Sequence, residues 1–189
     1  MQTIAKIALA APVVAATILL AVRYWPEDHT PEAAVAAASS DPVHTSADAT
    51  TGIVGRASVI DGDTLEIGGV RVRLHGVDAP ESSQNCVANG ATYRCGQRAA
   101  LALSDLIGVQ TVRCEQLDTD RYGRAVARCL AGGQDVAEVL VAEGFAVAYR
   151  QYSRDYVAAE GRAQRERKGL WAGDFVPPDQ YRRQRRGGT

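Results

Sequence analysis

Apolar and polar residues alternate in short segments near the middle of the chain, as they do in β-strands. Residues 53–60 alternate loosely, residues 64–67 form a second short segment, and residues 70–75 form a third. Gly68 and Gly69 separate the last two segments, and such a pair is typical of a tight hairpin turn. The pattern therefore predicts three consecutive strands, the last two joined as a hairpin.

The strand predicted at residues 70–75 sorts its side chains by chemical type. Successive side chains of a strand point to opposite faces. One face would therefore carry Val70, Val72 and Leu74, and the other Arg71, Arg73 and His75. We expect the apolar face to meet a core and the basic face to remain available for binding.

The second half of the chain shows a helical period in three places. Apolar and small residues recur at helical spacing in residues 96–107, and further helices are predicted at residues 136–145 and 156–167. Two more strands, at residues 110–116 and 125–130, follow the first helix. Five strands with interspersed helices predict an α+β, mainly β fold, in which about three helices pack on a small five-stranded barrel.

The N-terminal part of the chain differs from the rest. Residues 7–22 form an apolar run of sixteen residues in which only Thr17 is polar. A membrane-spanning helix needs about 17 to 25 residues, a length that is just reached if Ile4 and Ala5 are included. Both a cleaved secretory signal and an uncleaved signal anchor fit this pattern. The small residues at which cleavage would occur lie more than ten positions beyond the run, which favours an anchor within residues 1–25.

Charges around the apolar run predict its orientation. Lys6 precedes the run and acidic residues follow Arg23, so the positive-inside rule places the N-terminus in the cytoplasm. The rest of the chain would then lie on the periplasmic or extracellular side of a single-pass membrane anchor. Secretion after cleavage of the signal is the alternative.

Composition separates a linker and a tail from the folded part. Residues 26–51 lack apolar periodicity and are rich in Ala, Ser, Thr, Asp and Pro, which predicts a disordered linker. Residues 1–51 hold two basic and five acidic residues, so the remaining 19 basic and 17 acidic residues give residues 52–189 a net charge of +2. Such a domain is no strongly basic nonspecific binder, and nucleic acid would need a local site. Residues 176–189 form a basic tail that would help to collect polyanions.

All four cysteines of the chain lie in the part that we expect to be exported. Their even number favours two disulfides, although four cysteines allow three pairings. Cys114 and Cys129 lie on predicted strands that flank a polar turn, and Cys86 and Cys95 bracket a loop, so we expect these two pairs. A zinc site is the alternative, but the sequence has no close Cys-x2-Cys pair and no histidine at ligand spacing.

Three short motifs carry the acidic and basic side chains that phosphodiester hydrolysis needs. They are Asp61-Gly-Asp63-Thr, Arg73-Leu-His-Gly-Val-Asp78-Ala-Pro-Glu81 and Asp120-Arg-Tyr-Gly-Arg124. A cation and arginine donors offset the negative charge of the phosphate, and a carboxylate can take a proton from the attacking water. Taken singly, each motif is also compatible with an ordinary polar turn or a surface charge. Their combination favours a site.

Each acidic or basic residue suggests its own role in that site. Asp63 and Asp78 are hard oxygen donors at strand boundaries, which suits Ca²⁺ or Mg²⁺ better than zinc or copper. Glu81, close after Asp78, is the candidate base, and Arg73 can bind two phosphate oxygens at once. Arg124 is a second candidate phosphate ligand. Tyrosines near these motifs can stack on a base, although packing is at least as good an explanation for them.

The ordered set of three motifs resembles the staphylococcal nuclease (thermonuclease-like) family over residues 53–171. This resemblance implies an OB-fold barrel with three helices in residues 52–175, and Ca²⁺-dependent cleavage of DNA and RNA that leaves 3′-phosphates. It implies Asp63, Asp78 and the backbone carbonyl of Ala79 as calcium ligands, and Glu81 as the general base. Arg73 and Arg124 would hold the phosphate and the transition state, and the remaining substrate contacts would be Arg121, Tyr122 and Tyr149.

We therefore expect a membrane-anchored, exported and monomeric Ca²⁺-dependent endonuclease that acts on DNA and RNA, with a preference for single strands. A non-catalytic OB-fold module that binds nucleic acid or protein is the alternative from another class, and a calcium-stabilised adhesion domain is a third. These possibilities are distinguished by five charged groups that are all present: Asp63, Asp78, Glu81, Arg73 and Arg124. A binding scaffold does not need the whole set, and an adhesion domain has no use for the arginines.

Overall fold

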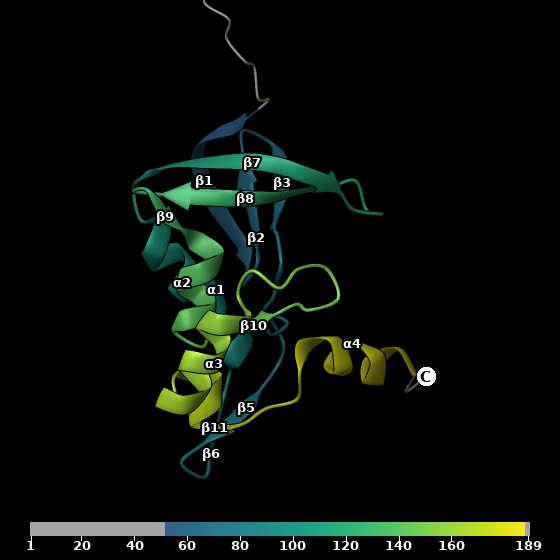
Figure 1. Ribbon diagram of the computed structural model, residues 1–189. Helices are drawn as coiled ribbons and strands as arrows, with labels where there is room; N and C mark the ends of the chain where they lie inside the picture. Colours follow the sequence, from purple (N-terminus) through teal and green to yellow (C-terminus); the bar gives the residue numbers. More distant parts are fainter. Residues whose placement is uncertain (1–51, 188–189) are drawn as a thin grey trace, which may run out of the picture. The chain divides into compact units, whose positions relative to one another are not determined.

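The alternating segments form the strands of a barrel. The structure, a computed structural model, describes residues 52–187. Strands β1 (Gly52–Asp61), β2 (Thr64–Ile67) and β3 (Val70–Leu74) pair antiparallel in sequence order, β1 with β2 and β2 with β3. Ile67 pairs with Val70 across the predicted glycine turn. The three predicted strands are confirmed (Figure 1).

Two further strands close the barrel. Strands β7 (Thr111–Thr119) and β8 (Ala125–Ala131) form a hairpin, and β7 pairs antiparallel with β1. A parallel pairing between β3 and β8 joins the two ends of the sheet, and β9 (Gln134–Asp135) extends it beyond β8. The predicted five-stranded barrel is therefore present.

The barrel interior is filled by aliphatic side chains from several strands. Leu65, Val72, Leu74 and Val112 are fully or almost fully buried in this core. The two-faced pattern predicted for β3 holds for Val72 and Leu74. It is wrong for Val70, which is 43% exposed because it lies at the start of the strand beside the glycine turn.

Three helices lie against one end of the barrel, as Figure 1 shows. They are α1 (Cys95–Ile107), α2 (Val136–Ala142) and α3 (Val157–Glu166), followed by the short 3-10 helix η1 (Gly169–Ala172). Helix α1 buries Ala99, Leu103 and Ile107 in the core, which confirms its predicted apolar face. The side chain of Asp135 accepts hydrogen bonds from two backbone N–H groups at the start of α2 and so caps this helix.

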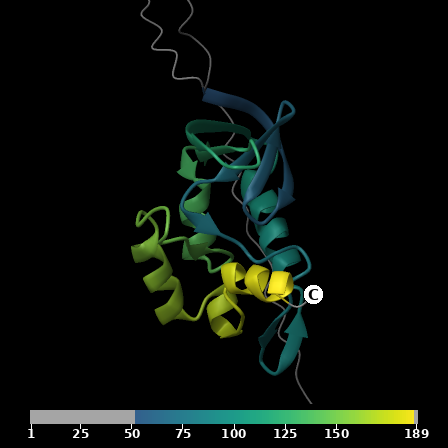
Figure 2. The ribbon, with the colours of Figure 1, turned by 90° about the vertical axis from the view of Figure 1, so that its right-hand side faces the viewer.

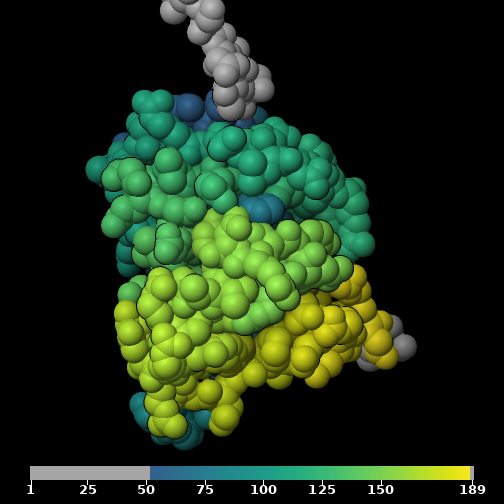
Figure 3. All heavy atoms as spheres, viewed as in Figure 1, coloured from purple at the N-terminus to yellow at the C-terminus, as the bar shows by residue number. Residues whose placement is uncertain are grey.

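A fourth helix, α4 (Pro178–Gly187), occupies most of the predicted basic tail. It stands apart from α1, α2 and α3 in Figure 1, and the space-filling view in Figure 3 shows it in yellow beside the yellow-green segment that follows α2. The described residues thus hold four α-helices, where we expected about three.

Short strand pairs organise the loops around the barrel. Strand β4 (Val77–Asp78) pairs with β10 (Val147–Ala148). The loop between Cys86 and Cys95 contains a hairpin of β5 (Cys86–Ala88) and β6 (Ala91–Tyr93), to which β11 (Gly173–Asp174) adds a third strand. Both predicted disulfides are present: Cys86 bonds to Cys95, and Cys114 bonds to Cys129, its register partner across the β7–β8 hairpin.

The predictions for the N-terminal part of the chain are not tested by the fold. The signal anchor in residues 1–25 and the linker in residues 26–51 lie outside the described residues. Within residues 52–187, no helix has the length and apolar character needed to cross a membrane.

Candidate active site

Two buried carboxylates and one arginine form the centre of the site. Asp63 lies in the turn between β1 and β2, and Asp78 ends β4. Arg73 donates from Nη1 to Asp63 Oδ1 at 2.8 Å and from Nη2 to Asp78 Oδ1 at 3.0 Å. A single guanidinium group therefore joins two acids that lie fifteen positions apart in the sequence.

Burial dominates the electrostatics of these acids. It raises the pKa of the Asp63 carboxyl, against the opposing effects of Arg73 and the Ala79 amide. Burial also raises the pKa of Asp78, and neighbouring Asp63 adds to this shift. Two negative charges are thus held close together in a poorly hydrated place, where additional positive charge would be strongly favoured.

Close backbone packing brings the two acids together. The Ala79 N–H donates to Asp63 Oδ2 at 3.0 Å, which ties the turn after β1 to the end of β4. A Cβ atom on Gly62 would lie 2.7 Å from the Cβ of Ala79 and 2.8 Å from that of Ala99. The glycine of the Asp61-Gly62-Asp63 motif is therefore needed for this approach.

Glu81 is positioned by a buried glutamine that the sequence analysis did not single out. Gln84 is fully buried, and its side-chain Oε1 accepts from the backbone N–H of Glu81 at 3.3 Å. The backbone N–H of Gln84 donates to the Glu81 carbonyl at 2.7 Å. Helix α1 approaches the same loop at Gly96, where a Cβ atom would collide with the Glu81 carbonyl oxygen. The Glu81 backbone is thus held firmly, whereas its side chain is 40% exposed.

An arginine from the C-terminal helix completes the cluster. Arg182 donates from Nη1 to Asp78 Oδ1 at 2.9 Å and to Glu81 Oε1 at 2.8 Å, and from Nη2 to Asp78 Oδ2 at 2.8 Å. Burial lowers the pKa of Arg182, but the hydrogen bonds to Asp78 and Glu81 outweigh this effect and raise it. Figure 2 looks onto α4, in yellow, on this side of the protein.

Arg124 is linked to the same cluster through a threonine. Its Nε donates to Asp120 Oδ2 at 2.7 Å, and its Nη1 lies 3.5 Å from Thr64 Oγ1. Thr64 in turn donates to Asp63 Oδ1 at 3.1 Å. Asp120 braces its loop, since its carboxylate also accepts from two backbone N–H groups in the turn.

The predicted substrate-binding residues lie around the cluster. Arg121 stacks over the ring of Tyr122 at 5.0 Å, and the Tyr122 side chain is exposed on the turn between β7 and β8. Tyr149 follows β10, its N–H donates to the Gly76 carbonyl, and its ring packs edge-on against Tyr152. In residues 52–187, these three residues make no hydrogen bond or ion pair with Asp63, Asp78 or Glu81, and their roles stay predictions.

The donors of the cluster suit a hard cation. Carboxylate oxygens and a backbone carbonyl are the ligands that Ca²⁺ and Mg²⁺ prefer. Over residues 52–187, however, no group of three His, Cys, Asp or Glu side chains stands ready around a common metal position. Arg73 separates Asp63 from Asp78 instead, and Arg182 separates Asp78 from Glu81.

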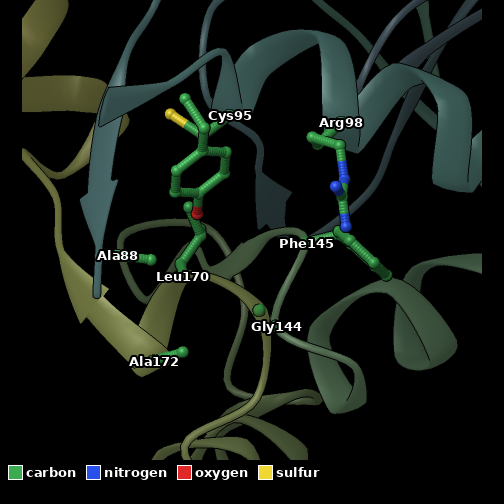
Figure 4. Close-up of a pocket in the computed structure, with 9 residues that line it drawn as sticks. Ala88, Cys95, Arg98, Gly144, Phe145, Leu170 and Ala172 are labelled. Atoms are coloured by element: carbon green, nitrogen blue, oxygen red, sulfur yellow. The ribbon is translucent and has the colours of Figure 1, made fainter. Parts of the chain in front are cut away.

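A cavity elsewhere in the protein carries none of these groups. It encloses about 300 Å³ and is lined by residues of the β5–β6 hairpin, α1, η1 and the loop after α2. Figure 4 shows Cys95, Arg98, Phe145 and Leu170 among the residues that line it. None of the predicted catalytic or metal-binding residues lines this cavity.

Comparison with known proteins identifies the family. Residues 71–173, more than half of the chain, match the family described as "Staphylococcal nuclease homologue". The chain belongs to the staphylococcal nuclease family. This membership confirms the resemblance and agrees with the closed five-stranded barrel, which fits the OB-fold.

The chain is also similar to several individual proteins. The succinoglycan biosynthesis protein ExoI of Rhizobium meliloti is 45% identical over 123 residues, which cover 63% of this chain and 64% of ExoI. An uncharacterized endonuclease of Haemophilus influenzae is 37% identical over 134 residues, or 67% of this chain and 70% of the relative. A micrococcal nuclease of Shigella flexneri is 36% identical over 131 residues, or 60% and 70%. The chain thus spans less than two thirds of ExoI.

The structure therefore brings together five predicted residues of this nuclease-family site: Asp63, Arg73, Asp78, Glu81 and Arg124. It also adds Thr64, Gln84 and Arg182, which the sequence analysis did not assign to the site. Thr64 directly follows Asp63 in its motif, and Arg182 lies in the tail already noted as basic, so both had a weak signal. Gln84 had none, because its importance comes only from burial.

Removing Arg73 tests how far the two buried acids depend on it. We expect Arg73→Ala to lower the free energy of unfolding by about 2 to 4 kcal/mol, because it leaves Asp63 buried without a guanidinium partner. Arg71→Ala, at an exposed position on the same strand, should change it by less than about 0.5 kcal/mol. Urea unfolding of both variants measures the difference, and equal losses would contradict this view of the cluster.

Proposed function

We propose that the chain is a Ca²⁺-dependent endonuclease that hydrolyses phosphodiester bonds of DNA and RNA and leaves 3′-phosphates. The observation that carries the proposal is the convergence of Asp63, Asp78 and Glu81 with Arg73 and Arg124 in one place. Membership of the family supports the same conclusion, since relatives of this chain are named nucleases and endonucleases.

In this proposal the acidic residues have two roles. Asp63, Asp78 and the carbonyl of Ala79 would hold the cation, which supplies positive charge to the phosphate and to the water that attacks it. Glu81 is the base that takes the proton from that water. Gln84 holds its backbone in place, and its partly exposed carboxylate can pass the proton on to bulk solvent.

The arginines complete the proposed mechanism. Arg73 is anchored by two carboxylates, and the N–H groups that these bonds leave unused can donate to a phosphate oxygen. Arg124 is held by Asp120, reaches Thr64, and can offer a second set of donors. Both positive groups would then face the charge that develops during cleavage.

Export of the folded domain is part of the proposal. Two disulfides in residues 52–187 support it, because disulfides persist mainly in oxidising compartments. We further propose that the apolar run in residues 7–22 anchors the protein in a membrane, with the nuclease domain on the periplasmic or extracellular side. We also propose that the protein is a monomer and prefers single-stranded substrates.

Digestion of labelled oligonucleotides tests the proposed activity. The purified full-length chain should cleave single-stranded DNA and RNA when calcium is present, and EDTA should stop it. Glu81→Gln should lower kcat by about 10² to 10⁴, because the amide cannot take the proton, while KM changes little. Glu115→Gln, at an exposed position on β7, is the matched control and should keep full activity. Cleavage in EDTA, or full activity of Glu81→Gln, would contradict the proposal.

A further inference from the structure

Several contacts at the start of helix α4 hold it beside the active site. Gln84 Nε2 donates to the Val176 carbonyl at 2.6 Å, directly before the helix, and Pro178 is the only buried residue of α4. The hydroxyl of Tyr181 lies within hydrogen-bond distance of Ser83. The same glutamine therefore positions both the Glu81 loop and the start of α4.

A hollow lies between α4 and the Glu81 loop. It encloses about 240 Å³ and is lined by Glu81, Ser83, Tyr181, Arg182, Arg185 and Arg186. Arg185 donates to the hydroxyls of Ser83 at 3.0 Å and of Tyr181 at 3.4 Å, and its guanidinium lies 5.9 Å from the Tyr181 ring centre. The hollow thus offers hydroxyl groups, an aromatic ring and cationic donors next to the proposed base.

The arginines of α4 divide into two groups by their partners. Arg183, which does not line the hollow, forms an ion pair with Asp179 one turn earlier. Among the described residues, Arg185 and Arg186 form no ion pair with a carboxylate, although both line the hollow. Basic residues favour the C-terminal end of any helix. That preference does not explain why two arginines without a carboxylate partner lie beside Ser83.

We propose that Ser83, Tyr181, Arg185 and Arg186 form a phosphate-binding surface for the nucleic-acid strand on one side of the cleaved bond. Unpaired guanidinium groups and hydroxyls are suited to phosphate oxygens, and Tyr181 can stack on a base. The inference deepens the proposed function, because the strand on this surface is the same strand that the carboxylate cluster would cut.

Oligonucleotide binding in EDTA tests this surface without requiring cleavage. Fluorescence anisotropy would compare the full-length wild type with the double variant Arg185→Ala/Arg186→Ala, using labelled single-stranded DNA of sixteen nucleotides and of two. The double variant should bind the longer strand at least about fivefold more weakly. Its salt-dependence slope should fall by about 1.4, because each phosphate contact on a single strand contributes about 0.7. Binding of the dinucleotide, which cannot span both sites, should change less than about twofold.

Two further variants keep this test decisive. Arg183→Ala removes a charge from the same helix outside the hollow and should bind the longer strand like the wild type. Arg185→Lys/Arg186→Lys keeps the charges and should retain most of the binding. Equal weakening in Arg183→Ala and the double variant would overturn the surface in favour of a general charge effect, as would unchanged binding in the double variant. A protein that binds as expected but never cleaves would contradict the proposed function alone.

A second inference rests on a different observation, the position of the Arg182 guanidinium. Its two Nη atoms take both oxygens of Asp78 and one oxygen of Glu81. Asp78 would be a ligand of the cation in the proposed function, so a cation and Arg182 cannot both use its oxygens in this way. Arg182 belongs to a helix in which only Pro178 is buried, so its side chain could leave the acids without disturbing the core.

We propose that Arg182 is an internal counter-ion that competes with the divalent cation for Asp78 and Glu81. The arginine neutralises the buried acid in the cation-free protein, and cation binding releases it. The contacts of Gln84 with Val176 and of Ser83 with α4 remain, so the helix stays beside the site after the Arg182 side chain is released.

Calcium titration and hydrogen exchange together test this competition. In calorimetry, Arg182→Gln should bind calcium about tenfold more tightly than the wild type, the factor expected if the arginine holds the acids about 90% of the time. Calcium should speed hydrogen exchange of the α4 amides in the wild type by about threefold or more. It should have no such effect in Arg182→Gln, where the contact between α4 and the acids is already absent. Arg183→Gln should behave like the wild type in both measurements.

The outcomes separate this inference from the proposed function. Calcium binding with unchanged exchange in α4, or with equal affinity in Arg182→Gln and the wild type, would overturn the competition alone. The absence of calcium binding in both proteins would contradict the proposed cation and the competition together.

Discussion

The burial of Asp63 and Asp78 side by side is the constraint on which the site depends. Two carboxylates in a poorly hydrated place repel each other and lose hydration, and the cost is offset only by positive charge and hydrogen bonds. Arg73 supplies both to the pair, and Thr64 and the Ala79 amide add hydrogen bonds to Asp63. Arg182 covers the remaining oxygen of Asp78, Oδ2. The burial still raises the pKa of both acids. A site of this kind is prepared for one more positive charge.

The fold meets this constraint through close approaches rather than through the barrel alone. Gly62 lets the turn after β1 lie against Ala79 and helix α1, and Gly96 lets α1 approach the backbone of Glu81. Gln84 then joins the Glu81 loop to the segment that enters α4. The barrel provides the strand ends, and these three residues bring the acids on them within reach of a common set of arginines.

Much of this arrangement could be predicted from the sequence, because the relevant signals are local. Alternation gave β1, β2 and β3, helical spacing gave α1, and the facing strands β7 and β8 gave the Cys114–Cys129 pair. The three motifs also indicated which acids and arginines would meet. The β5–β6 hairpin was missed, although Asn89 and Gly90 mark its turn, since its strands have only three residues each.

Other parts of the site leave no local signal. Arg182 lies 104 positions from Asp78, and nothing in a basic tail shows that one of its arginines folds back onto a buried acid. Gln84 is chemically ordinary, and only its complete burial makes it a positioning residue. Such long-range contacts are decided by how α4 packs against the Glu81 loop, a property of the whole fold.

The claim at the centre of this account is that the acids around Arg73 form a cation site. A crystal structure of the protein grown with calcium tests it most directly. The account predicts an ion about 2.3 to 2.6 Å from oxygens of Asp63, Asp78 and the Ala79 carbonyl, with Arg182 displaced from Asp78. An ion bound elsewhere, with Arg182 still paired with Asp78 and Glu81, would contradict it.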